Sequence, residues 1–180
     1  LEAGKNFTVD VTVSVPTGQS PGNYWTYIRA SSGNAGSDLA MLNLNVPLNM
    51  SWTRTPSTFG TLLTPPNTAG IVGNIITTNI GNVKIWLRVY KTENGTQFVR
   101  IYPEYFTLDK TSSRNISINY TIPSDAIEGM YYVKILMVNN SADPAEQETD
   151  FWLNVTDIPP TIEEVKVHPT TFEINYEKTE

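Results

Sequence analysis

The sequence predicts an all-β chain made of tandem two-layer β-sandwich modules, one complete module flanked by two partial ones. Three observations support this prediction: apolar and polar residues alternate along most segments, turn-forming residues separate those segments, and one block of sequence occurs twice. The repeated block starts at Leu1 and again at Leu108, and it continues without a gap. The anchors of the repeat are Leu1 and Leu108, Pro16 and Pro123, Gly22 and Gly129, Tyr24 and Tyr131, and Ile28 and Ile135.

Each expected strand rests on a period of two, which places successive side chains on opposite faces of a sheet. The first strand covers 7–15, where one face carries Phe7 and four valines, Val9, Val11, Val13 and Val15. Its repeat at 115–122 carries Ile116, Ile118, Tyr120 and Ile122 on the matching face. The remaining strands are expected at 50–62, 71–78, 83–90, 98–101, 131–138 and 149–155.

Turn-forming dipeptides and tripeptides lie between these segments, and no segment shows helical spacing with helix caps. The turns are expected at Ser20-Pro21-Gly22, Pro65-Pro66-Asn67, Asn94-Gly95 and Asp143-Pro144. About seven short strands per module, separated by turns, are typical of a β-sandwich.

The repeat also sets the expected domain boundaries. Residues 1–48 are interpreted as the last strands of one domain, 49–157 as a complete domain, and 158–180 as the start of a third. A second echo supports the third domain, because Thr55-Pro56-Ser57-Thr58-Phe59 resembles His168-Pro169-Thr170-Thr171-Phe172. We therefore expect the chain to be an excerpt or a processed piece of a longer protein.

A Gly-x-Tyr motif opens a strand in both copies of the repeat, at Gly22-Asn23-Tyr24 and Gly129-Met130-Tyr131. This motif resembles the tyrosine corner of immunoglobulin-like domains. In that family a Cys follows two residues after the Tyr, whereas this chain has Thr26 and Val133 there. The whole chain resembles the immunoglobulin-like, cell-adhesion-related (CARDB-type) repeats of prokaryotic, and especially archaeal, surface proteins. The resemblance implies a spacer, stalk, lattice or adhesive role at the cell surface.

Composition excludes several classes of function. The formal net charge of −6 and the pI near 4.8 argue against nucleic-acid binding, which needs a basic surface. The chain has no cysteine, which removes disulfides, zinc–thiolate sites and thiol catalysis, and no apolar run is long enough for a membrane span. His168, the single histidine, matches Thr55 in the repeat and is expected in a turn. We expect no catalytic residues and no cofactor.

Seven Asn-x-Ser/Thr sequons occur, about twice the number that composition alone predicts, and they indicate an exported glycoprotein. The expected glycosylation sites are Asn6, Asn49, Asn94, Asn115, Asn119, Asn139 and Asn154. The alternation places Asn115, Asn119 and Asn154 on solvent-facing positions of their strands.

An aromatic and basic stripe is expected on the outer side of one sheet, because strands 83–90 and 131–138 are neighbours in the immunoglobulin-like fold. Its members are Lys84, Trp86, Arg88, Tyr90, Tyr132 and Lys134, with Trp25 and Tyr27 at matching positions of the first repeat. Exposed Trp, Tyr and Arg are typical of protein interfaces. Cross-strand packing and sugar binding are the alternative interpretations.

The acidic residues Asp143, Glu146, Glu148 and Asp150 are weak candidates for calcium ligands, as is Glu163-Glu164. They lack the spacing of a dedicated calcium loop, and an edge strand carries solvated charges for other reasons.

These observations favour a structural or adhesive extracellular protein, such as a surface filament, an S-layer-like lattice or a stalk, which associates with itself or with neighbouring surface proteins. A carbohydrate-binding or accessory module of an extracellular hydrolase is the alternative. A weaker possibility is that 161–176 adds a strand to the open first domain of a neighbouring molecule.

Overall fold

The computed structural model is all-β and describes residues 7–33 and 36–157. Within these residues there is no α-helix and a single short 3-10 helix, η1 (Thr96–Phe98). The strands are β1 (Gly22–Ser32), β2 (Gly36–Val46), β3 (Trp52–Thr55), β4 (Thr58–Thr64), β5 (Thr68–Asn79), β6 (Ile85–Thr92), β7 (Val99–Tyr102), β8 (Tyr105–Leu108), β9 (Ser113–Ile122), β10 (Gly129–Val138) and β11 (Glu146–Val155).

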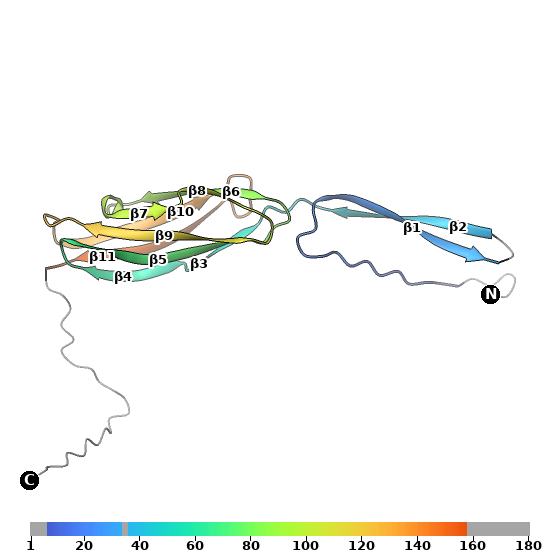
Figure 1. Ribbon diagram of the computed structural model, residues 1–180, viewed down its shortest axis with the longest axis horizontal. Coiled ribbons are helices and arrows are strands. Elements are labelled where there is room, and N and C mark those ends of the chain that lie inside the picture. The colour runs from blue at the N-terminus through green and yellow to red at the C-terminus, as the bar shows by residue number, and fades with distance from the viewer. Residues whose placement is uncertain (1–6, 34–35, 158–180) are drawn as a thin grey trace, which may run out of the picture.

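The strands form a two-layer sandwich and a separate hairpin. The sandwich packs a five-stranded sheet, in the order β4-β11-β10-β6-β8, against a four-stranded sheet, in the order β3-β5-β9-β7. The strands β1 and β2 pair only with each other, and their hairpin extends from one end of the sandwich (Figure 1). This arrangement confirms the prediction of an all-β, immunoglobulin-like fold.

The core lies between the two sheets and is built from the apolar residues that the alternation assigned to inner faces. On β6 the inner residues Ile85, Leu87 and Val89 are buried, and on β10 so are Val133, Ile135 and Met137. Trp52 and Phe151 are the largest fully buried side chains. Each such side chain contributes roughly 1.5–3 kcal/mol on burial, so the sheets are held together without a disulfide.

The predicted strand at 50–62 is in fact two strands that belong to different sheets. β3 pairs antiparallel with β5 in the four-stranded sheet, and β4 pairs parallel with β11 in the five-stranded sheet. The chain crosses between the sheets at Pro56, which has no backbone N–H to donate to a ladder.

One strand, β8, was not predicted from the sequence. It follows Pro103 and pairs with β6 at the edge of the five-stranded sheet, with Ile85 opposite Leu108 and Arg88 opposite Tyr105. It has four residues, Tyr105–Leu108.

Both predicted tyrosine corners are confirmed by matching hydrogen bonds. The hydroxyl of Tyr24 donates to the carbonyl of Ser20 at 2.7 Å, and the hydroxyl of Tyr131 donates to the carbonyl of Ile127 at 2.8 Å. Each bond anchors the start of its strand to the loop four residues earlier.

The loops before these strands also share their backbone geometry. The amide of Gln19 donates to the carbonyl of Pro16 at 3.1 Å, and the amide of Ala126 donates to the carbonyl of Pro123 at 3.3 Å. The repeat detected in the sequence is therefore a repeat of the three-dimensional structure as well.

The prediction of a β-strand at 7–15 is wrong, because these residues are not part of any sheet. This segment runs beside the hairpin in Figure 1 but forms no assigned strand, and Phe7 and the four valines of its apolar face are exposed. Its repeat, β9, is paired on both sides by β5 and β7. No strand equivalent to these two lies beside residues 7–15 among the described residues, so no ladder forms there.

Candidate functional site

The hairpin meets the sandwich at a joint made from the linker after β2 and the loop between β5 and β6. The side chain of Asn82 donates to the carbonyl of Pro47 at 2.8 Å and accepts from the amide of Asn49 at 2.8 Å. The amide of Asn82 donates to the carbonyl of Asn49 at 2.9 Å. One asparagine thus fixes the linker at three points.

The loop that carries Asn82 is stabilised by hydrogen bonds from the buried side chain of Asn79. The side chain of Asn79 is buried, and its amide nitrogen donates to the carbonyls of Val83, Leu108 and Asp109 at 2.8, 3.2 and 3.2 Å. Its oxygen accepts from the amide of Gly81 at 2.9 Å. A Cβ at Gly81 would collide with the carbonyl of Asn49, so the close approach of the linker requires glycine here.

A second contact at the joint comes from the loop before β1. The ammonium of Lys110 donates to the hydroxyl of Ser20 at 3.4 Å, and Gly18, at φ +74°, lies against the methyl group of Thr111. The joint therefore holds the hairpin through both the linker and this loop.

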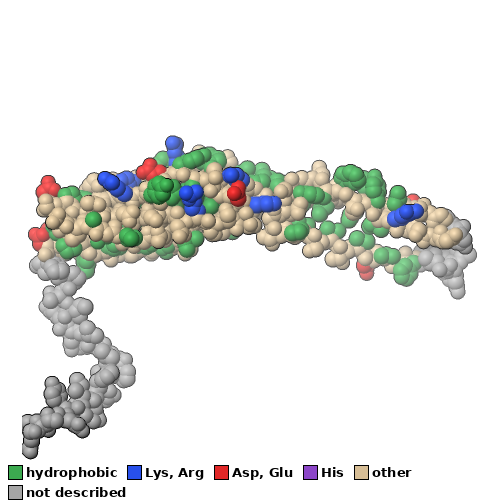
Figure 2. Space-filling view, viewed as in Figure 1, with side chains coloured by type: hydrophobic (Ala, Val, Ile, Leu, Met, Phe, Trp, Pro, Cys, Tyr) green, Lys and Arg blue, Asp and Glu red, His purple; other side chains and the backbone are tan. Residues whose placement is uncertain are grey.

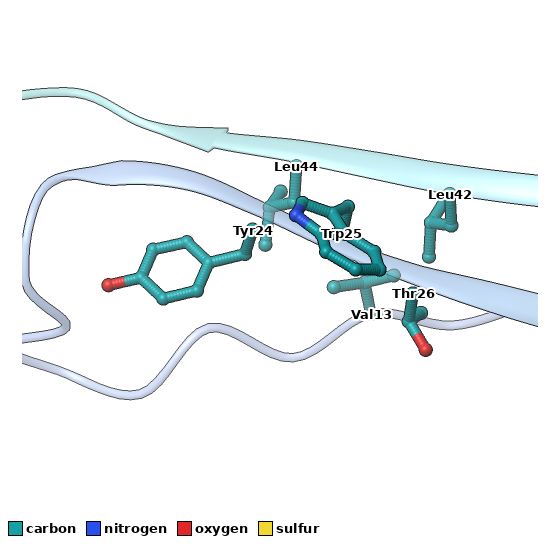
Figure 3. A pocket seen from close by; sticks show the side chains of 6 residues that line it. All are labelled: Val13, Tyr24, Trp25, Thr26, Leu42 and Leu44. Atoms are coloured by element: carbon teal, nitrogen blue, oxygen red, sulfur yellow. The ribbon is translucent and has the colours of Figure 1, made fainter.

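The hairpin has an apolar side that lies toward residues 7–15. A pocket of about 140 Å³ lies between the hairpin and this segment, and in Figure 3 the ring of Trp25 lies between the two leucines, Leu42 and Leu44, and Val13 of the neighbouring segment, with Tyr24 to one side. Thr26 completes the lining. In Figure 2 hydrophobic side chains lie on both sides of the hollow between the hairpin and this segment.

The outer side of the five-stranded sheet carries the predicted stripe, and we call it the aromatic face. The residues of β6 alternate as expected, with Trp86, Arg88 and Tyr90 exposed on this face. The residues of this face that the argument below uses are Trp86, Arg88, Tyr90, Tyr105, Tyr132, Lys134, Leu136, Val138, Glu146, Glu148, Asp150 and Trp152.

Two aromatic pairs lie on the aromatic face, and each includes a residue that the sequence reasoning missed. The ring centroids of Trp86 and Tyr105 are 6.1 Å apart, and those of Tyr132 and Trp152 are 4.8 Å apart. Tyr105 was missed with its strand. Trp152 could have been found, since it alternates with Phe151 and Leu153 on a strand that borders β10.

The charges of the aromatic face are mostly compensated. The ammonium of Lys134 lies 3.0 Å from the carboxylate of Glu148, which raises the pKa of Lys134. The hydroxyls of Thr58 and Tyr132 donate hydrogen bonds to Asp150 and lower the pKa of that carboxyl. The bond from Tyr132 to Asp150 is 2.9 Å long and raises the pKa of Tyr132. The aromatic face therefore carries paired acidic and basic side chains beside the residues of the predicted stripe.

The other cations of the predicted stripe have different environments. The guanidinium of Arg88 lies 5.6 Å from the ring centroid of Tyr90, a cation–π geometry. Lys84 precedes β6 and pairs with Asp109 at 3.2 Å, with both side chains largely exposed. Trp25 and Tyr27 lie on the hairpin instead, exposed and in edge-to-face contact at 5.8 Å.

The four acidic candidates for calcium do not gather. Glu146, Glu148 and Asp150 point outward from alternate positions of β11, and Asp143 lies in the turn before that strand. Among the described residues no three His, Cys, Asp or Glu side chains lie close enough to hold a metal ion. Glu163, Glu164 and His168 lie outside the described residues.

Most of the sequon asparagines are accessible. Asn115 and Asn119 are exposed on β9, on the outer side of the four-stranded sheet, and Asn49 and Asn94 are exposed in loops. Asn154 is half-buried on β11. Asn6 lies outside the described residues.

Asn139 is a correction, because the folded protein leaves no room for a glycan there. Its side chain is 1% exposed and accepts a hydrogen bond from the amide of Ser141 at 3.0 Å. The residue therefore stabilises the turn after β10. A sequon motif carries no information on burial, which is why the sequence did not reveal that Asn139 is buried.

Comparison with known proteins gives a likeness in fold. No family model matches the chain, and no curated protein matches it in sequence. Among solved structures, a family 123 glycoside hydrolase from Clostridium perfringens matches 57% of the chain at 10% identity with a TM-score of 0.50. The match covers 23% of that enzyme, so it concerns one β-sandwich part of a larger protein.

Two weaker matches are a PapD-like domain of human CEP192 and the E. coli chaperone DraB, each with a TM-score of 0.44 and 11% identity. They cover 66% and 62% of this chain, and 92% and 58% of the respective matched chains.

Within the described ranges no helix has the length and apolarity of a membrane span.

Proposed function

We propose that this chain is part of an archaeal or bacterial surface protein of tandem immunoglobulin-like units of the CARDB type, and that its role is mechanical and associative rather than catalytic. The hairpin and residues 7–15 belong to one unit, 49–157 form the next, and 158–180 begin a third. Such an array would serve as a surface filament, an S-layer-like lattice or a stalk.

The joint is the single observation that carries this proposal. Two units that only shared a flexible tether would show few contacts across it. Here Asn82 makes three hydrogen bonds to the linker, while the loop before β1 contacts Lys110 and Thr111. A joint fixed from two sides transmits orientation from one unit to the next, which a stiff spacer requires.

Export and glycosylation form the second part of the proposal. The paired sequons Asn115 and Asn119 lie on the outer side of the four-stranded sheet, where neighbouring outward residues include Asn74 and Ser117. Because both asparagines are exposed there, this side is proposed as the glycosylated one.

Joint stiffness is tested by distance measurements on the full chain, which contains no native cysteine. Spin labels at Ser31→Cys on the hairpin and Glu104→Cys on the sandwich report the distance distribution by electron double resonance. We expect a narrow distribution that Asn82→Ala broadens and that Asn43→Ala, on the exposed hairpin face, leaves unchanged. A distribution that is already broad in the unmodified chain would contradict the proposal.

Glycosylation is tested separately on the native protein by its intact mass before and after deglycosylation. A mass that is unchanged by deglycosylation would remove this part of the proposal and leave the mechanical part standing.

A carbohydrate-binding module is the second candidate, and the two aromatic pairs are the observation that favours it. Trp86 and Tyr105 have ring planes inclined by 33°, and Tyr132 and Trp152 by 35°, so each pair offers a broad aromatic surface of the kind on which sugar rings stack. Binding on a glycan array that disappears with Trp86→Ala, but persists with Trp25→Ala on the hairpin, would favour this function.

A further inference from the structure

The aromatic face combines exposed rings with uneven charge, which makes it unlike an ordinary solvated sheet face. Trp86, Tyr90 and Trp152 are 41%, 42% and 40% exposed, and Tyr105 is 60% exposed. Contiguous exposed apolar side chains are typical of interaction sites, and Trp, Tyr and Arg are the residues that anchor protein interfaces.

On the aromatic face, positive and negative side chains lie on different strands. The outward residues of β6 include the cation Arg88, whereas those of β11 include the acids Glu146, Glu148 and Asp150, followed by Trp152. The strand between them, β10, presents Leu136 and Val138. The β6 side of the central residues Leu136 and Val138 therefore carries one cation with aromatic rings, and the β11 side carries three carboxylates beside Trp152.

The register places these groups in rows across the sheet. Val138 lies opposite both Arg88 on β6 and Glu146 on β11. In the next row Leu136 lies opposite both Tyr90 and Glu148. Each row thus has an apolar centre with chemically different ends.

This pattern is self-complementary under a two-fold rotation about an axis parallel to β10. The rotation lays the aromatic face of a second copy on the first, puts β6 over β11 of the partner, and matches Arg88 with the partner's Glu146 twice. Leu136 and Val138 then meet their own counterparts on the axis. Lys134 also lies on β10, but Glu148 already compensates its charge at 3.0 Å.

We propose that the aromatic face is an isologous interface through which two copies of this chain associate side by side. In such an interface each contact occurs twice, and two sheets that pack face to face lie about 10 Å apart. The proposal rests on the mechanical and associative function proposed above, and it names the surface and the partner. The sequons Asn115 and Asn119 are on the opposite sheet, so glycans there leave the interface free.

The test is sedimentation equilibrium of the full chain with charge reversals. We expect a concentration-dependent dimer whose dissociation constant rises about tenfold or more with Arg88→Glu or with Glu146→Arg, because each reversal turns two attractions into repulsions. The double variant Arg88→Glu/Glu146→Arg restores the pairs and should return the constant to within about threefold of its original value. The control Arg100→Glu, on the outer side of the four-stranded sheet, should have no effect.

A chain that stays monomeric, single reversals that behave like the Arg100→Glu control, or a double variant that does not recover would each overturn the interface. Sugar binding at Trp86 without self-association would overturn it as well. When labelled chain is diluted with an excess of unlabelled chain, the spin-label distances across the joint come from within one copy and do not depend on dimer formation. A failed interface with a narrow distance distribution therefore leaves the proposed function intact, whereas a broad distribution counts against that function alone.

Discussion

Replacement of Asn79 by alanine tests whether the loop at the joint is held by a buried polar network. Asn79 is fully buried at the end of β5, and its side chain makes four hydrogen bonds. Alanine removes all four bonds and leaves the buried partner groups without a hydrogen-bond partner. The bonds to Leu108 and Gly81 are the most deeply buried.

The expected loss follows from those two buried partners. A buried donor or acceptor without a partner costs about 1–3 kcal/mol, so two of them together with the weaker losses predict about 3–5 kcal/mol of unfolding free energy. For a domain of this size that corresponds to a fall in melting temperature of roughly 10–20 °C. Asn79→Asp should lower the unfolding free energy at least as much as Asn79→Ala, since a carboxylate would face three carbonyl oxygens.

Guanidinium unfolding followed by tryptophan fluorescence measures this loss, because Trp52 is 1% exposed in the core and reports unfolding of the sandwich. Asn74→Ala is the matched control, since Asn74 lies on the same strand, is exposed, and only accepts from the hydroxyl of Ser117 at 2.9 Å. A loss below about 1 kcal/mol for Asn79→Ala, or one equal to that of the control, would refute the reasoning.

Three further predictions concern other parts of the sandwich. Gly73→Ala should destabilise it by about 1–3 kcal/mol, because the added methyl group would overlap the ring of Phe59, and Gly33→Ala, where an added methyl group meets no other atom, tests whether overpacking is the cause. Glycopeptide mass spectrometry of the native protein should find sugar at Asn115 and Asn119 and none at Asn139, and Asn139→Gln should lower the melting temperature while Asn119→Gln should not. Because its hydrogen bonds lower the pKa of Asp150 in the folded state, this carboxyl adds stability above the unfolded pKa of about 3.9, and that stability is lost as the pH falls through the folded value. Asp150→Asn should flatten this acid limb of the stability curve, and an unchanged limb would show that other carboxyls produce it.

The sequence predicted the strands of the sandwich well where burial on one face imposes alternation. On β6 and β10 every inward and outward assignment was correct, since the residues that face the core are buried and their neighbours are not. The tyrosine corners were predictable because a Gly-x-Tyr motif encodes a local hydrogen bond within four residues.

Features that depend on distant partners were not predictable. The alternation of residues 7–15 matches that of β9, but a strand also needs neighbours, and the equivalents of β5 and β7 do not lie beside it among the described residues. The crossing at Pro56 and the edge strand β8 depend in the same way on which sheet accepts each segment.

The candidate site shows the same division. Trp86, Arg88 and Tyr132 were placed on one face from alternation alone, whereas the compensation of Lys134 by Glu148 required the register between β10 and β11. The burial of Asn139 depends on the fold of the turn after β10, which its sequon does not describe.

The parallel pairing of β4 with β11 has a consequence for how the sandwich would respond to pulling. The chain enters the sandwich at the hairpin end and leaves it from the opposite end (Figure 1). In the five-stranded sheet, β4 is the first strand along the chain and β11 is the last, and the two are neighbours. Tension along this axis would slide β4 past β11 and strain the pairings from Thr58–Asp150 to Thr64–Val155 together rather than one after another. Rupture then needs many backbone bonds to break at once, so the sandwich would resist a sudden load far better than its equilibrium stability suggests.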